Sequence, residues 1–173
     1  MRLRHLTTLL TLSLLPVLPL APPATAAPLP ATTAPTAAPA TAPAALAPAV
    51  TAPLSYAAQL HALTNAERTK RGLRPLAGST CAGGFANRQA VRLAAAGVLR
   101  HQALSPILTA CHATVAGENL AYGNVTPARM MAMWMASPGH RANILSPKYN
   151  RLGVSAVRGA GGRVYAVQVF LKV

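Results

Sequence analysis

The stretch Gly117–Leu145 reads GENLAYGNVTPARMMAMWMASPGHRANIL, and it determines both the expected fold and the candidate site. Thr126-Pro127 and Ser137-Pro138 each place a capping hydroxyl before a proline, a pairing typical of the first turn of a helix. We therefore expect one helix from Thr126 to about Ala136 and a second from Ser137 to about Leu145. The same stretch holds Glu118, one of only two acidic residues in the chain.

Glu118, His140 and the upstream His101 form the candidate site, together with the neighbouring Asn119 and Ser137. Two imidazoles and a carboxylate suit general acid–base work or a divalent metal, with His101 and His140 as the metal ligands and Zn²⁺ as the one cofactor suggested. The N-terminus of a helix would lower the pKa of His140 and favour its neutral, metal-binding form. The alternative is structural: Glu118 holds a histidine or backbone amides in place.

The remaining elements follow from apolar spacing and turn residues. We expect a helix from Ser55 to about Arg71, with a surface ion pair between Glu67 and Arg71, and a second helix capped by Ser79 or Thr80. Gly97 ends that second helix, and residues 102–116 are expected to form a long surface loop. Two β-rich runs joined by glycines predict a C-terminal hairpin, Leu152–Val157 and Val164–Leu171. These helices and strands together indicate an α+β domain with helices packed on an antiparallel sheet.

Residues 1–53 are not expected to belong to the folded domain. Residues 1–26 have a basic start, an apolar run and small residues at their end, which predicts a secretory signal peptide, with an uncleaved membrane anchor as the alternative. Residues 27–53 consist almost entirely of Ala, Pro and Thr, which predicts an extended, disordered linker. Residues 54–173 then form one domain, with no transmembrane segment in the mature form.

The charge of the chain suggests polyanionic partners. Loss of Arg2 and Arg4 with the signal peptide lowers the formal charge from +14 to +12. A secreted protein this basic is attracted to anionic envelope polymers or lipids, although the charge also serves solubility alone. The basic residues are scattered and not interleaved with aromatic ones, so no specific nucleic-acid binding is expected.

Cys81 and Cys111 are the two cysteines of the chain. An isolated pair in an exported protein is typical of a disulfide. Closing a loop of this length stabilises a fold by about 3–4 kcal/mol in the chain-entropy model. Oxidation would consume both thiols, which argues against a catalytic cysteine.

The ordered motifs of the domain resemble those of the CAP superfamily, the cysteine-rich secretory, antigen 5 and pathogenesis-related proteins also called SCP domains. The resemblance runs from about Leu60 to Phe170, and its most specific part is the run from Trp134 to Leu145. It implies an α-β-α sandwich and a central cleft lined by two histidines and two acidic residues. His101, Glu118 and His140 match three of these positions. The second acid would fall in Met135–Ser137, which holds no carboxylate.

These observations favour a secreted, cell-envelope or extracellular binding module over an enzyme, with a His/Glu cleft for a lipid, wall polymer or other ligand. The alternative is a metal-assisted, peptidase-like hydrolase that uses His101, Glu118 and His140. A secreted nuclease is the weakest hypothesis, because a magnesium site needs more carboxylates than the chain has.

Overall fold

The computed structural model describes residues 54–173. The predicted signal peptide (1–26) and linker (27–53) lie outside the described residues. In chain order the elements are α1 (Tyr56–Thr69), β1 (Ala77–Gly78), α2 (Thr80–Ala96), α3 (Ser105–Ala110), β2 (Val115–Gly123), α4 (Pro127–Ala136), α5 (Pro138–Leu145), β3 (Arg151–Arg158), the 3₁₀ turn η1 (Ala160–Gly162) and β4 (Val164–Lys172). None of the helices within residues 54–173 is both long enough and apolar enough to cross a bilayer.

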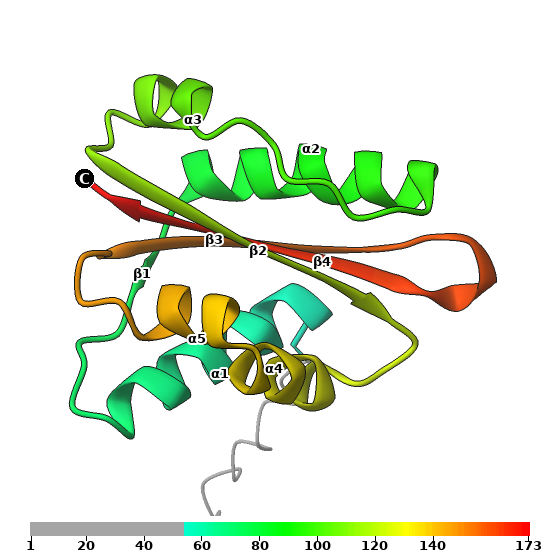
Figure 1. Ribbon diagram of the computed structural model, residues 1–173, viewed down its shortest axis with the longest axis horizontal. Coiled ribbons are helices and arrows are strands. Elements are labelled where there is room, and N and C mark those ends of the chain that lie inside the picture. Colours follow the sequence, from blue (N-terminus) through cyan, green and yellow to red (C-terminus); the bar gives the residue numbers. More distant parts are fainter. Residues whose placement is uncertain (1–53) are drawn as a thin grey trace, which may run out of the picture. The chain divides into compact units, whose positions relative to one another are not determined.

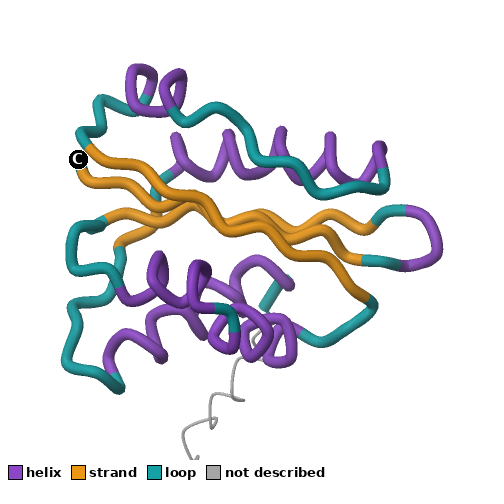
Figure 2. The backbone as a smooth tube through the Cα atoms, viewed as in Figure 1, coloured by secondary structure: helices purple, strands orange, loops and turns teal. Residues whose placement is uncertain are grey.

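The described residues form three layers with the sheet in the middle (Figure 1). Helices α2 and α3 cover one face of the sheet, and α1, α4 and α5 cover the other, as the tube view also shows (Figure 2). The strand order is β1-β3-β4-β2. Strands β3, β4 and β2 pair antiparallel, and the two-residue β1 joins β3 in parallel. The predicted α-β-α sandwich and its C-terminal hairpin, β3 with β4, are therefore confirmed.

Strand β4 is the centre of the core, because both of its faces are covered. Val167, Val169 and Leu171 pack toward α2, whereas Ala166 and Phe170 pack toward α1, α4 and α5. This accounts for the nearly continuous apolar run in β4, since a strand buried on both faces does not alternate with polar residues. The edge strand β2 then lies beside β4 with one side unpaired.

Three of the expected helix starts have the predicted cap. The hydroxyls of Ser55, Ser79 and Thr126 each accept a hydrogen bond from an amide three residues ahead, at 3.2–3.3 Å. Ser137 is different: it occupies the N-cap of α5, but its side chain makes no capping hydrogen bond. The local start signal for α5 is therefore the proline rather than the hydroxyl.

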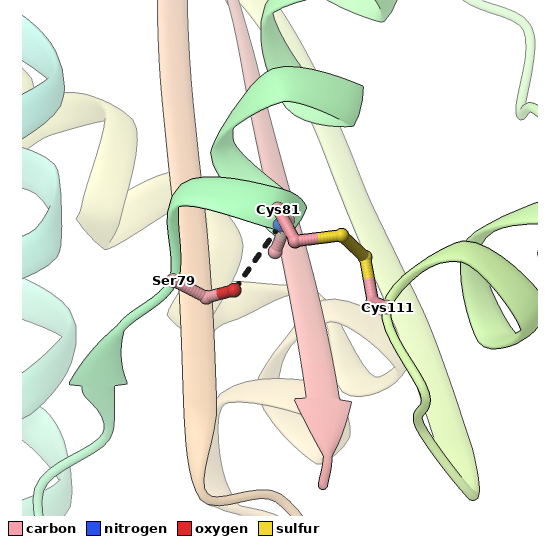
Figure 3. Close-up of a disulfide and its surroundings, with 4 residues drawn as sticks. Ser79, Cys81 and Cys111 are labelled. Atoms are coloured by element: carbon pink, nitrogen blue, oxygen red, sulfur yellow. Dashed lines mark hydrogen bonds between the residues drawn. A yellow bond between two sulfur atoms is a disulfide. The ribbon is translucent and has the colours of Figure 1, made fainter.

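The long surface loop predicted for residues 102–116 is wrong in two places. Its middle forms the short helix α3, and its end is the first part of β2. A Ser-Pro pair stands at the start of both α3 and α5: Ser105 and Pro106 are the first two residues of α3, whereas Ser137 is the N-cap of α5. Figure 3 shows the disulfide that ties this segment to the first turn of α2. It joins Cys81 to Cys111 with a Cα–Cα distance of 5.8 Å, so the predicted pairing is confirmed.

Arg68 is the largest charged side chain in the interior. It is only 2% exposed. Its guanidinium donates to the backbone oxygens of Arg74, Ile144 and Ser146 at 2.8–2.9 Å. Two of these carbonyls end α5, where the helix dipole concentrates negative potential. The buried charge thus joins α1 to the C-terminal end of α5, and burial lowers the pKa of its guanidinium.

Candidate functional site

The candidate site lies along the free edge of β2. Backbone carbonyls that point outward from an edge strand need partners, and two side chains supply them here. Asn143 Nδ2 donates to the oxygen of Glu118, and Trp134 Nε1 donates to the oxygen of Leu120, each at 3.2 Å. The helices α4 and α5 are thereby held against the edge of the sheet.

The Glu118 carboxylate is buried on the α2 side of this edge, and both of its oxygens accept hydrogen bonds. Its Oε1 accepts from His101 Nδ1 at 2.7 Å and from the Gln102 amide at 3.3 Å. Its Oε2 accepts from Gln102 Nε2 at 2.6 Å. A carboxylate only accepts, so His101 Nδ1 carries a proton in this contact. Gln89, buried in α2, donates to the Arg100 oxygen and so fixes the backbone just before His101.

His140 approaches the same edge from the opposite layer. It sits in the first turn of α5 and is half-buried. Burial, and secondly the charge on His101, lowers the pKa of His140. The imidazole of His140 is therefore neutral at neutral pH, as the sequence predicted, but burial and His101 are the causes.

A buried polar chain holds His140 in this position. Asn119 Nδ2 donates to the His140 oxygen at 3.0 Å and to Gln168 Oε1 at 3.1 Å. Asn119 Oδ1 accepts from Asn143 Nδ2 at 2.9 Å, and Gln168 Nε2 donates to Thr64 Oγ1 at 2.7 Å. The chain crosses from α1 through β4 and β2 to α5, and it satisfies every polar atom of the Gln168 and Asn119 side chains.

Two pockets lie along the free edge of β2. The first, of about 330 Å³, is lined by His101, Gln102 and Glu118 together with Leu104, Ala116, Gly117, Asn143 and Tyr149. The second, which we name the edge pocket, has a volume of about 470 Å³. Its lining is mostly apolar: Leu99, Leu120, Ala121, Tyr122, Met133, Trp134, Ser137 and His140.

The donor set does not fit a tightly held metal ion. Within residues 54–173 no group of three or more His, Cys, Asp or Glu side chains is arranged to hold one. Both oxygens of Glu118 already accept hydrogen bonds, and His101 Nδ1 is committed to one of them. Zinc would have to break these contacts to gain Glu118 as a third ligand beside the two histidines, so the residues present do not fit a zinc site.

The structure places the predicted residues in three different settings. His101 and Glu118 are in direct contact, and His140 and Ser137 line the edge pocket on the other side of β2. Asn119 is fully buried, and its side chain holds the backbone of His140 through a hydrogen bond. Gln102 was missed, although it directly follows His101 and provides two of the three hydrogen bonds to the Glu118 carboxylate.

Comparisons with known proteins agree with this architecture. The model of the cysteine-rich secretory protein family (CAP) matches residues 61–170. The protein YkwD of Bacillus subtilis is 34% identical over 112 residues, which is 60% of this chain and 43% of YkwD. The chain thus spans less than half the length of this curated relative.

Solved structures show the same fold. A cysteine-rich secretory protein from Staphylococcus aureus has a TM-score of 0.59 at 25% identity, covering 68% of this chain and 38% of its own. An outer surface protein of Borrelia burgdorferi has a TM-score of 0.60 at 19% identity, covering 65% of this chain and 89% of its own. Because the family model matches well over half of the chain, and these structures share its three layers, the chain belongs to the cysteine-rich secretory protein (CAP) family.

Proposed function

We propose that this chain is an exported binding module of the cell envelope, and that its edge pocket takes an amphipathic ligand with an apolar chain and a polar head. One observation carries the proposal. Three of the exposed large apolar side chains, Leu99, Tyr122 and Met133, come from three separate segments and line this one pocket. A gathered apolar patch of this kind is typical of a binding surface, whereas scattered apolar residues are not.

The polar groups of the edge pocket lie where a ligand head group would be held. His140 and Ser137 line the pocket beside the apolar residues. The Arg163 guanidinium lies 4.9 Å from the centre of the Tyr122 ring, so a positive charge borders the same wall. This combination supports a lipid-like ligand with an anionic or hydrogen-bonding head.

Export and an anionic setting are parts of the same proposal. The disulfide fits an oxidising compartment outside the cytoplasm. A formal charge of +14 on the full chain supports retention by anionic envelope polymers or lipids. The predicted signal peptide and linker supply a route out of the cell and a tether.

The alternative, a metal-assisted hydrolase, has less support. Its carboxylate, Glu118, is buried and already accepts three hydrogen bonds. Within the described residues both cysteines are in the disulfide, so neither is a nucleophile. The same contacts suit a supporting role, in which Glu118 orients His101 at the mouth of the site.

The test uses Trp134, the single tryptophan, because it lines the edge pocket. Full-length protein is titrated with phosphatidylglycerol vesicles whose acyl chains carry bromine, which quenches tryptophan fluorescence at short range. The variant Leu99→Ser/Met133→Ser removes two apolar walls of the pocket. Val91→Ser is the matched control, since Val91 is 49% exposed on α2 and lines none of the pockets described here.

We expect quenching by wild type and by the control, and roughly tenfold or greater weakening in the double variant. Each apolar side chain that loses its contact forfeits about 1 kcal/mol or more of binding free energy. If the control weakens as much as the double variant, the edge pocket is not the binding site. Equal quenching by neutral phosphatidylcholine vesicles would remove the anionic part of the proposal.

A further inference from the structure

We propose that a third pocket, which shares no lining residue with the edge pocket, binds the phosphate groups of a linear phosphodiester polymer that carries no bases. This basic pocket is defined by Arg74, Lys148, Arg151 and Lys172, and its volume is about 540 Å³. The inference deepens the proposed retention on anionic envelope polymers and rests on it, but it does not depend on the ligand of the edge pocket.

The four cations come from four segments that the fold brings together. Arg74 follows α1, Lys148 lies between α5 and β3, Arg151 begins β3, and Lys172 ends β4. No Asp or Glu side chain is among the residues that line the basic pocket. Four positive charges around one concavity attract polyanions far more strongly than the same charges scattered over a surface.

The carboxylates of the domain are engaged elsewhere. Glu67 pairs with Arg71 at 2.7 Å, as the sequence predicted, and with Lys70 at 3.3 Å. Glu118 is held by His101 on the edge of β2. Within residues 54–173 the cations of the basic pocket therefore have no side-chain carboxylate as a counterion, and an external anion can take that place.

The walls of the basic pocket are fixed before any ligand arrives. Arg68 also lines this pocket, and its guanidinium donates to the oxygens of Arg74, which lines the pocket, and of Ser146, which directly precedes the lining residue Pro147. The Ala77 amide donates to the Asn150 oxygen at 3.1 Å, and the Asn150 amide donates to the Leu171 oxygen at 2.9 Å. A prearranged backbone lowers the entropy lost on binding, so the exposed cations are presented in a defined arrangement.

The aromatic content of the basic pocket separates a plain phosphodiester polymer from nucleic acid. Single-stranded nucleic acid needs aromatic faces on which its bases stack. Tyr149 is the one aromatic residue that lines the pocket, and its ring stacks on Phe170 with 5.4 Å between centroids. Its hydroxyl is also directed to Asn143. A polyol phosphate chain of the wall-polymer type makes no such demand, since its contacts are charge and hydrogen bonding alone.

The experiment compares two triple variants of the full-length protein that carry the same net charge. The pocket variant is Arg74→Gln/Lys148→Gln/Lys172→Gln, and the surface variant replaces Arg100, Arg129 and Arg141 by Gln. Each lowers the formal charge from +14 to +11. All six residues are exposed, so both variants should unfold at the wild-type urea concentration. Binding to immobilised poly(glycerol phosphate) and to poly(dT) is measured from about 50 to 300 mM salt.

For poly(glycerol phosphate), the slope of log affinity against log salt concentration should be smaller in magnitude by about two in the pocket variant than in wild type. Each lost phosphate contact removes about 0.7 from this slope, and the variant loses three cations. The surface variant should change by well under one. An equal change of slope in both variants would show that the basic pocket is not the polymer site, while the proposed retention on anionic envelope polymers would stand. If the wild-type protein does not bind poly(glycerol phosphate), both the pocket proposal and the retention proposal are wrong. Equal or tighter binding to poly(dT), lost in the pocket variant, would replace the polymer with nucleic acid.

Discussion

Replacing Asn119 by Ala tests whether the buried polar chain holds the candidate site together. The substitution removes three hydrogen bonds, to the His140 oxygen, Gln168 Oε1 and Asn143 Nδ2. A net loss of about 1 kcal/mol for each bond, with a further 1–3 kcal/mol for the stranded Gln168 oxygen, gives roughly 4–6 kcal/mol. That is a large part of the roughly 5–15 kcal/mol that stabilises a typical domain.

Urea unfolding followed by Trp134 fluorescence measures this loss directly. Asn150→Ala is the matched control, because the Asn150 side chain also makes two hydrogen bonds, both to Val173, but in an exposed position. Water replaces the lost partners there, so we expect a decrease of about 1 kcal/mol or less. If Asn119→Ala is no more destabilising than Asn150→Ala, the buried chain does not support the site as argued.

Three further predictions concern other parts of the fold. Gly153→Ala should destabilise the domain by at least about 3 kcal/mol or prevent folding, because the new methyl group would overlap the main chain of α2 at Ala82. A variant that unfolds at the wild-type urea midpoint would contradict this. The free energy of unfolding should fall as the pH drops below about 6.5, because burial lowers the folded-state pKa of His61 and of His140, the latter with a smaller effect of His101, and the unfolded chain therefore takes up protons first. His140→Gln should flatten the decline in urea midpoint between about pH 7.5 and 5.5. An unchanged decline would show that His140 does not contribute to the pH dependence of stability. Reducing the disulfide should lower the free energy of unfolding by about 3–4 kcal/mol at constant pH, which calorimetry with and without a reductant can check.

Local chemistry was sufficient to predict most of the helices. The starts at Ser79 and Thr126 depend on contacts within a single turn, so the nearby sequence contains the necessary information. The same logic failed for α3, because its six residues are too few to show a helical apolar stripe. Strand β1 was missed for a similar reason, since two residues show no alternation.

The candidate site was predicted less completely, because its contacts are long-range. Glu118 and Asn119 were expected in one cleft, but neighbouring residues of a strand point to opposite faces of the sheet. Glu118 consequently faces the α2 layer, whereas Asn119 faces α5 and the core. The burial of Arg68 depends on carbonyls that are 76 and 78 residues away in sequence, so no local sequence pattern predicts it.

The disulfide also has a topological consequence for survival outside the cell. It closes a covalent ring from Cys81 to Cys111, and the exposed segment from Ala95 to His101 lies inside this ring. A protease that cuts there, for example after Arg100, opens the ring but releases no fragment. The piece that ends at Arg100 contains Cys81, and the piece that begins at His101 contains Cys111 and β2, so the disulfide still joins the two. A nicked molecule therefore separates into two pieces only after the disulfide is reduced.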